Sequence, residues 1–332
     1  MNKKLFIRCD FSEQIGLGHL KRMLILAKSF NQLKYQIKIF YKKNRFSFDF
    51  VDLGFSVCSN NIVLEEEFID SLIIEKPEIC ILDLHSKDKY IEILNKINKS
   101  VKNIKLICFE YSADIEKYSD LCIVPFPFIA NSSKKVLSGL NYQMFSEDLY
   151  YFKNKMKIKK KDDVVLISFG GSDPNNYSFM VLKTLIELKF KHEYFVILGP
   201  FFKNKNKRMV KILAKNYPNI SIIDKPSKLG EYYFISDYVI SSGGQSKFEV
   251  ALFKKPNYII PNNVLEKKYS KIFSRINGLS YVQNENKITT FNLRKGFKNF
   301  INKYSKKNYE FHRLKSLFDG NEVSRIVKNI IK

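Results

Sequence analysis

Short apolar runs alternate along the chain with longer segments whose apolar residues recur at helical spacing. Five runs in the first half predict buried strands: Leu5–Arg8, Gln36–Tyr41, Ile79–Asp83, Ile104–Phe109 and Leu121–Val124. Five more follow in the second half: Val164–Phe169, Tyr194–Leu198, Ile220–Ile223, Tyr238–Ser241 and Tyr258–Ile260. The segments that predict helices most clearly are His19–Phe30, Ser178–Leu188 and Ser246–Phe253.

This alternation comes in two blocks, which predicts two α/β domains, each built on a parallel sheet. The charged run Lys153–Asp163 lacks a strong apolar face and suits a surface linker between the two blocks. We therefore expect one domain over residues 1–152 and a second over residues 163–316. Residues 317–332 are expected to contain a terminal helix, because Val323–Ile331 is amphipathic at helical spacing.

The net charge of the chain is large, yet it changes this picture little. The 57 Lys+Arg oppose 33 Asp+Glu, which gives +24, but only 8 of the basic residues are arginine and 49 are lysine. Proteins that read nucleic acids favour arginine, whose planar fork matches phosphates and guanine edges. The excess is more typical of a solvated lysine-rich surface. We expect no nucleic-acid partner, while an anionic small-molecule ligand remains compatible with the charge.

Two further features bear on where the protein resides. No apolar run approaches the roughly 18–20 residues that span a bilayer, and the N-terminus has no apolar stretch of signal-peptide length. We expect a cytoplasmic protein that does not insert into a membrane. Four of the five cysteines, Cys9, Cys80, Cys108 and Cys122, stand in or beside apolar runs. This placement favours reduced core thiols over metal ligands or nucleophiles.

The first candidate site is the run RCDFSEQIGLGHLKR that begins at Arg8, in which a predicted strand enters a glycine-containing loop that opens a helix. Gly16 and Gly18 allow a sharp turn and a close approach to a ligand. The unpaired amides at the helix start favour an anion. His19 stands at that start, where it is either a packing or capping residue or a general acid or base. The loop context favours the second interpretation.

A second glycine-rich loop, ISFGGSDPNN, opens a helix in the second half of the chain. Gly170 and Gly171 are followed by the small polar Ser172. Paired glycines with small polar neighbours suit a phosphate or a sugar hydroxyl, although an ordinary strand-to-helix turn uses the same residue types.

The third loop, SSGGQSKFEVA, follows a later strand and contains Gly243 and Gly244. Ser246 and Glu249 fit a capping box, which would be purely structural. Alternatively, Ser246 and adjacent amides hold a pyrophosphate while the carboxylate of Glu249 binds two ribose hydroxyls. The two loops of the second block together predict a nucleotide at the carboxyl ends of its strands.

In this order, the motifs GxGHxxR, GGSDPxN and GGxSxxE resemble those of the UDP-sugar hydrolases of the pseudaminic-acid pathway (PseG) and the related spore-coat SpsG proteins, which are relatives of the MurG-like GT-B glycosyltransferases. The resemblance extends to the run SGLNY before the predicted linker and to Asp319-Gly320 with Arg325 near the end, so it covers almost the whole chain. It implies a GT-B fold: two Rossmann-like domains with parallel sheets facing a cleft. It also implies that the terminal helix crosses back to the first domain.

The resemblance further implies hydrolysis of UDP-2,4-diacetamido-2,4,6-trideoxy-β-L-altropyranose in nonulosonic (pseudaminic) acid biosynthesis. Water attacks the anomeric carbon and UDP departs. His19 would orient or deprotonate the water, and Ser12 and the Gly18 amide would lie near the sugar or diphosphate. Ser246 would lie near the diphosphate and Glu249 on the ribose. The resemblance implies no metal and no cofactor, since helix N-termini can stabilise a departing diphosphate.

The chain departs from the family's pattern in three places, one of which is Glu110-Tyr111, where the family has an acidic pair. In the run ILDLH, Asp83 matches, whereas His85 stands where a tyrosine near the reacting sugar is usual. The Asp-Asn-Gln usual after the strand that follows Pro256 is replaced by PNNVLE, which leaves the identity of the sugar open. The catalytic candidates are therefore His19, Asp83 and His85. The candidate substrate-binding residues are Arg8, Asp10, Ser12, Gly16, Gly18, Arg22, Gly170, Gly171, Ser172, Gly243, Gly244, Ser246, Lys247 and Glu249.

Two other functions remain open. A GT-B glycosyltransferase would use a UDP-sugar donor and would also need an acceptor groove. A basic nucleic-acid-binding protein is disfavoured by the few arginines and by the absence of a recognised binding motif. We expect a monomer whose partner is a UDP-sugar substrate.

Overall fold

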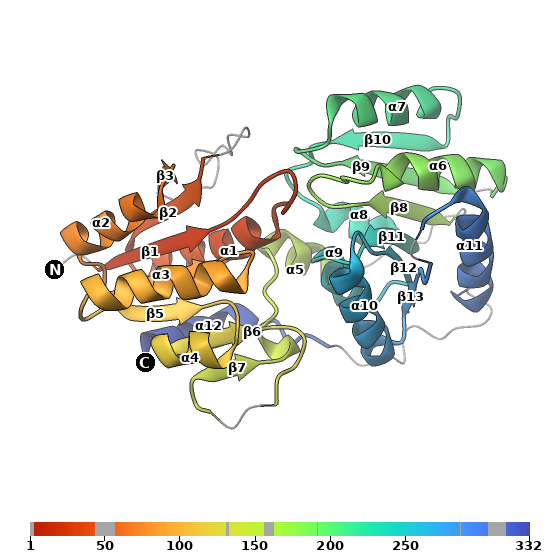
Figure 1. Cartoon of the computed structure of the whole chain (residues 1–332). Helices are drawn as coiled ribbons and strands as arrows, with labels where there is room; N and C mark the ends of the chain where they lie inside the picture. The colour runs from red at the N-terminus through yellow and green to blue at the C-terminus, as the bar shows by residue number, and fades with distance from the viewer. Residues whose placement is uncertain are drawn as a thin grey trace. The chain divides into compact units, whose positions relative to one another are not determined.

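The computed structural model of the chain describes residues 3–43, 57–130, 133–155, 163–190, 192–285, 287–304 and 317–332. It divides into two compact units (Figure 1). The first unit combines Met1–Phe145 with Phe318–Lys332, and the second is Ser146–Leu317. The first unit thus ends before residue 152, because helix α5 (Glu147–Lys153) packs on α8 (Gly230–Ile235) of the second unit. Residues 156–162 of the predicted linker lie outside the described residues.

The first unit is built on a parallel sheet with the strand order β3-β2-β1-β4-β5-β6-β7. Its strands are β1 (Lys4–Cys9), β2 (Gln36–Lys42), β3 (Cys58–Ile62), β4 (Ile79–Asp83), β5 (Lys105–Cys108), β6 (Leu121–Val124) and β7 (Val136–Ser138). The chain order reverses between β1 and β4. In sheets of this kind, ligands bind outside the carboxyl ends of the strands at such a point.

Helices cover both faces of this sheet (Figure 1). They are α1 (Gly18–Gln32), α2 (Glu65–Glu75), α3 (Lys87–Ser100), α4 (Ala113–Tyr118), the short 3-10 helix η2 (Leu140–Tyr142) and α12 (Glu322–Ile331). Along β1 successive side chains alternate between the faces. Phe6 packs in one core cluster with Phe68 of α2 and Tyr90 of α3. Helix α1 has the amphipathic pattern predicted from the sequence, with Leu20 and Phe30 among its buried residues.

The second unit repeats this plan with the strand order β10-β9-β8-β11-β12-β13. Its strands are β8 (Val164–Ser168), β9 (Glu193–Leu198), β10 (Ile220–Asp224), β11 (Tyr238–Ser242), β12 (Asn257–Ile260) and β13 (Ser280–Val282). Its helices, besides α5 and α8, are α6 (Tyr177–Glu187), α7 (Asn204–Ala214), α9 (Ser246–Leu252), α10 (Val264–Asn277) and α11 (Thr290–Tyr304). Here the chain order reverses between β8 and β11.

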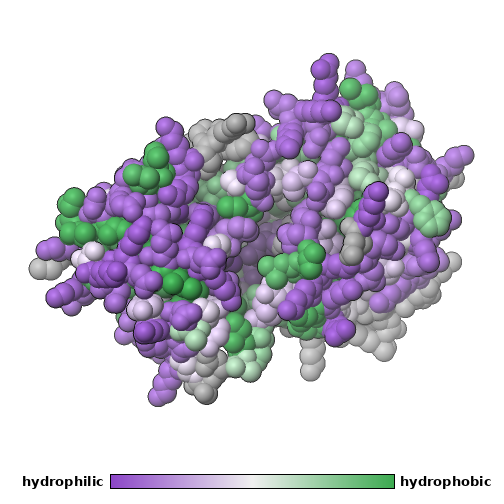
Figure 2. Space-filling model, viewed as in Figure 1, coloured by the Kyte–Doolittle hydropathy of each residue, from purple (hydrophilic) through white to green (hydrophobic). Residues whose placement is uncertain are grey.

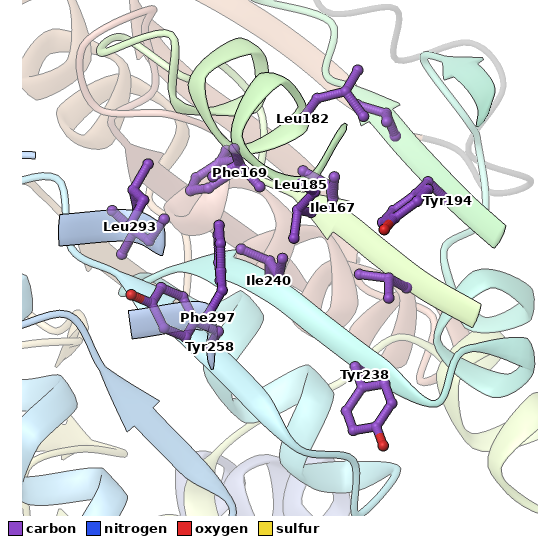
Figure 3. Close-up of a cluster of buried hydrophobic side chains, with 14 of the residues drawn as sticks. Ile167, Phe169, Leu182, Leu185, Tyr194, Tyr238, Ile240, Tyr258, Leu293 and Phe297 are labelled. Atoms are coloured by element: carbon purple, nitrogen blue, oxygen red, sulfur yellow. The ribbon is translucent and has the colours of Figure 1, made fainter. Parts of the chain in front are cut away.

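The second unit has its own hydrophobic core (Figure 3). Ile167 of β8 pairs in register with Ile240 of β11, and both are buried. The ring of Tyr258 lies 4.6 Å from that of Phe297 of α11, measured between centroids. Burial of each large apolar side chain contributes about 1.5–3 kcal/mol. A separate core of this kind is what allows the unit to be treated as a domain.

The C-terminal segment belongs to the first unit. The rings of Phe318 and Phe145 meet edge to face at 4.7 Å. Nη1 of Arg325 donates to the carbonyl of Asn141 in η2, and Nη2 pairs with Asp319. Helix α12 packs on α1. Two motif segments that are 184 residues apart at their contact, SGLNY and Asp319-Gly320 with Arg325, therefore contact each other.

All ten strands predicted from apolar runs are present, with ends that agree to within one residue. The three described strands that the runs did not predict are β3, β7 and β13, and each lies at an edge of its sheet. The four cysteines expected in the core, Cys9, Cys80, Cys108 and Cys122, are buried and free, while Cys58 is exposed.

The surface of the molecule is mostly hydrophilic on the face drawn in Figure 2, where hydrophobic side chains form small separate groups. Among the described helices, none combines the length and the apolar character needed to cross a bilayer.

Candidate functional site

The centre of the site in the first unit is a histidine held by a buried carboxylate. His19 lies in the first turn of α1, which follows β1, and Asp83 is the last residue of the neighbouring strand β4. Nδ1 of His19 is 2.7 Å from Oδ1 of Asp83. The Asp83 side chain has no exposed surface, whereas that of His19 is 22% exposed. A solvent-accessible imidazole is thus anchored from behind by a carboxylate.

Arg22 completes this arrangement and keeps the Asp83 carboxylate ionised. It lies one turn along α1 from His19 and donates from Nε and Nη2 to both oxygens of Asp83. Burial alone raises the pKa of Asp83, but the charges and hydrogen bonds of Arg22 and His19 outweigh burial and bring this pKa below its usual range.

An ionised carboxylate can only accept hydrogen bonds, so His19 donates to Asp83 from Nδ1. Nη2 of Arg22 also lies 3.1 Å from this nitrogen, but the contact with Asp83 is shorter and charge-assisted. The tautomer assigned on this basis carries its lone pair on Nε2. This atom is therefore suited to accept a proton.

The backbone on both sides of Asp83 is fixed by Tyr90 of α3. Its hydroxyl donates to the carbonyl of Leu82 at 3.2 Å and accepts from the amide of Leu84 at 3.0 Å. Tyr90 is fully buried. Sequence reasoning missed this residue, because an aromatic residue on the apolar face of a helix is indistinguishable from any other core residue.

His85 lies close to His19, with the two rings edge to face and their centroids 6.1 Å apart. Burial, followed by the charge of His19, lowers the pKa of His85, although Asp10 opposes the shift. The structure brings together the three residues that were singled out as catalytic candidates, His19, Asp83 and His85.

Arg8 and Asp10 support this group from the end of β1. Nη1 of Arg8 is 2.9 Å from Oδ1 of Asp10, and Oδ2 of Asp10 accepts from the amide of His85 at 3.3 Å. Arg8 was predicted to contact substrate, but its side chain has no exposed surface. Its guanidinium is directed at buried acceptors and holds the loop residues instead.

The loop between β1 and α1 turns at Ser12–Gly16. The amide of Gly16 donates to the carbonyl of Ser12 at 2.7 Å, and the Ser12 hydroxyl accepts from the amide of Ile15 at 3.2 Å. Gly16 has φ +81°, a backbone conformation that would be strained for a residue with a side chain. Gly18 begins α1, and Leu17 at the N-cap offers no side-chain acceptor to the first amides.

In the second unit, Gly170 and Gly171 follow β8 beside the point where the strand order reverses. Gly170 has φ +74°, and Ser172 is buried. Asp173 accepts from the amides of Tyr177 and Ser178, both at 2.8 Å, and so caps α6. Part of this motif is thus an ordinary strand-to-helix turn, while the two glycines lie where a ligand would bind.

Ser246 and Glu249 do not form the capping box that their spacing allows. Helix α9 begins at Ser246, after Gln245 at the N-cap, and has no side-chain cap. Oε2 of Glu249 instead accepts from the buried hydroxyl of Tyr233 at 2.8 Å. Among the described residues, Oε1 of Glu249 has no hydrogen-bond partner. The sequence offered no indication of Tyr233, which lies 16 residues earlier in α8.

Lys247 supports the third loop from behind. Its Nζ donates to the carbonyls of Gly243 at 2.6 Å and Gly244 at 3.1 Å. Burial lowers the pKa of Lys247 to about 8, although Glu266 opposes the shift. Lys247 was predicted to bind substrate, but only 5% of its surface is exposed, so it acts on the backbone of the loop.

Gly243 is required by close packing rather than by its φ angle. A Cβ atom there would lie 2.7 Å from the Ser270 hydroxyl and 3.1 Å from Cβ of Glu266. Helix α10, which contributes both residues, therefore approaches the loop closely. Within the described ranges, no cluster of three or more His, Cys, Asp or Glu side chains could hold a metal ion.

Comparison with known sequences identifies distant relatives. An uncharacterised protein of Methanocaldococcus jannaschii is 25% identical over 288 residues, which are 80% of this chain and 57% of that protein. The chain thus spans little more than half the length of this relative. A Campylobacter jejuni protein named UDP-2,4-diacetamido-2,4,6-trideoxy-β-L-altropyranose hydrolase is 23% identical, with 89% of this chain and 97% of that protein covered. The Bacillus subtilis spore coat polysaccharide biosynthesis protein SpsG is 23% identical, with 76% of each covered. No protein-family model matches the chain.

Comparison with solved structures establishes the fold. MurG of Acinetobacter baumannii has a TM-score of 0.66 at 14% identity, with 99% of both chains covered. MnaA of Staphylococcus aureus, solved with UDP, has a TM-score of 0.67 at 13% identity, with 99% of this chain and 96% of that chain covered. The two parallel-sheet α/β units are those of a GT-B fold, as the motif resemblance implied.

Proposed function

We propose that the protein is a UDP-sugar hydrolase that cleaves UDP-2,4-diacetamido-2,4,6-trideoxy-β-L-altropyranose to UDP and the free sugar, as a step of nonulosonic acid biosynthesis. The observation that carries the proposal is the contact of 2.7 Å between Nδ1 of His19 and Asp83. It leaves Nε2 of a partly exposed histidine ready to accept a proton from water. The C. jejuni relative, which is named for this activity, supports the choice of substrate.

In the proposed reaction, a water molecule attacks the anomeric carbon of the sugar. Its oxygen forms the new bond to carbon while Nε2 of His19 accepts one of its protons. The bond from the anomeric carbon to the phosphate oxygen breaks, and its electron pair leaves with UDP. Asp83 stabilises the imidazolium that forms, and Arg22 keeps Asp83 ionised throughout. His19 then returns the proton to solvent.

The loops of the second unit supply the groups for UDP in this proposal. Oε1 of Glu249 would accept from the ribose hydroxyls, while Tyr233 holds Oε2 in place. Ser246 and the amides of the Gly243-Gly244 loop would bind the diphosphate, and Lys247 keeps that loop in position. Preorganised amides of this kind stabilise negative charge without reorganising during the reaction.

The test is release of UDP from a panel of UDP-sugars, including the proposed substrate, without an added acceptor. His19→Ala should lower turnover at least about 10²–10⁴-fold, the usual contribution of a general base, while the Kd for UDP stays within about twofold of wild type. His192→Ala serves as a histidine control. His192 directly precedes β9 in the second unit, and this variant should retain turnover. A large loss of UDP affinity in His19→Ala would contradict the assigned role.

The same assay separates the other functions. UDP release that requires an added acceptor identifies a glycosyltransferase. No turnover together with salt-sensitive binding to DNA or RNA would reject both enzyme functions.

A further inference from the structure

Glu65 is a buried carboxylate that the proposed mechanism does not use. It is the first residue of α2 and is 8% exposed. Its Oε1 lies 2.7 Å from Nη2 of Arg8, and its Oε2 lies 2.9 Å from Nε of the same residue. Such a two-point contact fixes the plane of the guanidinium as well as its position. Lys42 lies further out, with Nζ 3.3 Å from Oε1 of Glu65.

Arg8 transmits this constraint to Asp10. With Nε and Nη2 on Glu65, its remaining nitrogen, Nη1, lies 2.8 Å from the carbonyl of Cys9 and 2.9 Å from Oδ1 of Asp10. All three nitrogens are therefore engaged, and the side chain has no exposed surface. The carboxylate of Asp10 cannot rotate without breaking a buried, charge-assisted contact.

Asp10 in turn connects β1 to the backbone after β4. Its Oδ2 accepts from the amide of His85 at 3.3 Å, and its own amide donates to the carbonyl of Asp83 at 3.1 Å. Lys89 of α3 also faces this oxygen, with Nζ at 3.6 Å. The position of His85 thus depends on where the Asp10 carboxylate is held.

We propose that Glu65 is a positioning residue of this site, which fixes Asp10 through Arg8 and the His85 backbone through Asp10. Without the Glu65 charge, Asp10 is the carboxylate that remains in contact with the buried guanidinium. Arg8 then draws Asp10 toward itself and away from the His85 amide. The consequence for turnover rests on the proposed function, whereas the coupling between Glu65 and His85 does not.

The first readout is hydrogen exchange at two backbone amides in Glu65→Gln. The His85 amide, held by Asp10, should exchange about tenfold faster than in wild type as its bond opens. The Leu106 amide of the same unit is held at 2.7 Å by the carboxylate of Asp120 and should be unchanged. The ratio of the two rates separates a local effect on His85 from a general loss of stability, which accelerates both.

The second readout is kinetic. His85 is a catalytic candidate whose ring lies 6.1 Å from that of His19. If it acts on the substrate, its displacement by about 1 Å costs up to about 10²-fold in rate, so kcat should fall about tenfold or more while KM changes little. Glu75→Gln is the matched control. It removes a carboxylate from the other end of α2, where Glu75 pairs with Lys4 and Lys38. This variant should leave both kcat and the exchange ratio at their wild-type values.

An unchanged exchange ratio in folded Glu65→Gln overturns the proposal, even if the melting temperature falls. If Glu65→Gln does not fold, Glu65→Asp takes its place, because it keeps the charge and loses one of the two contacts with Arg8. The exchange ratio of Glu65→Asp should rise by a smaller factor. An unchanged ratio in this variant also overturns the proposal. If the wild-type protein releases no UDP from any sugar, the proposed function fails, and the exchange ratio still decides the role of Glu65.

Discussion

His19 and Asp83 are 64 residues apart in the chain, yet their side chains meet at 2.7 Å. Helix α1 presents one and strand β4 the other, because β1 and β4 are neighbours at the point where the strand order reverses. Asp83 pairs at the same time with Arg22, which belongs to the same helix as His19. Oδ1 of Asp83 contacts both His19 and Arg22, while Oδ2 contacts Arg22, so one carboxylate joins helix to sheet and orients the imidazole.

Substitution Asp83→Asn should separate these two effects. The amide no longer fixes the His19 tautomer, so kcat should fall about 10²–10⁴-fold. It also leaves Arg22 without its buried counter-charge, so the free energy of unfolding should fall by about 3–5 kcal/mol. Steady-state UDP release measures kcat, and urea unfolding measures the free energy of unfolding. Asp120→Asn is the control, because it removes a carboxylate that holds the Leu106 amide in the same unit. Wild-type kcat in Asp83→Asn would refute the catalytic pair.

Substitution Tyr90→Phe removes one hydroxyl from between the amide and the carbonyl that flank Asp83. The Leu84 amide loses its partner, while the Leu82 carbonyl keeps the amide of Phe109 at 2.9 Å. We therefore expect a loss of about 1–3 kcal/mol in the free energy of unfolding and a lower kcat. Tyr194→Phe removes a comparable buried hydroxyl, which contacts the carbonyl of Phe190 in the second unit. It should lower stability without a change in kcat. Equal kcat in the two variants would limit Tyr90 to a role in folding.

The contact of Glu249 with Tyr233 predicts a graded effect on nucleotide binding. Glu249→Gln should raise the Kd for UDP about tenfold or more, since hydrogen bonds to a charged group contribute about 1.5–3 kcal/mol. Tyr233→Phe should have a smaller effect, because it only releases the carboxylate. Calorimetric titration with UDP and with 2′-deoxy-UDP provides the test. Wild type should prefer UDP, and Glu249→Gln should lose most of this preference. A preference retained in Glu249→Gln places the ribose elsewhere.

Lys247 predicts an unusual dependence of stability on pH. Its pKa in the folded protein is about 8, against 10.5 for an ordinary lysine. Between these values the unfolded chain binds more protons than the folded one, so the contribution of this residue to stability rises with pH. The slope is at most about 1.4 kcal/mol per pH unit.

The comparison that isolates this slope is wild type against Lys247→Met, which keeps most of the side-chain volume. The difference in the free energy of unfolding, wild type minus variant, should be flat below about pH 7.5 and should increase between about pH 8 and pH 10. Denaturant unfolding at several pH values measures it. A difference that stays flat or decreases over this range would show that the pKa of Lys247 is not lowered in the folded protein.

The interior strands of both sheets and the edge strand β10 could be predicted from the sequence, whereas the other edge strands, β3, β7 and β13, could not. Strands such as β4 and β12 are buried on both faces and read as continuous apolar runs. Strand β3, with the sequence CSNNI, lies at an edge and is mostly exposed, so no run marks it. The same holds for β7, whose residues are only partly buried.

In the candidate site, contiguous motifs could be predicted from the sequence, whereas contacts between residues far apart in the sequence could not. The glycine-rich loops and His19 could be found because they are contiguous in the sequence. Glu65 and Tyr233 could not, because their partners lie 57 and 16 residues away. Lys247 and Arg8 were assigned to substrate on the basis of charge, but the folded chain turns both toward the backbone and side chains that support the loops.

The ribosome synthesises Phe318–Lys332 after the rest of the described chain. This segment nevertheless packs in the first unit, whose other residues, Met1–Phe145, are synthesised before the second unit. During translation, every described strand and helix of the second unit is made before α12 of the first unit. Helix α12 packs against α1, the helix that bears His19 and Arg22. A nascent chain can therefore form its second unit before its first unit is fully packed. A ribosome that stalls short of this segment would leave α1 uncovered, a state that chaperones and proteases recognise by its exposed apolar surface.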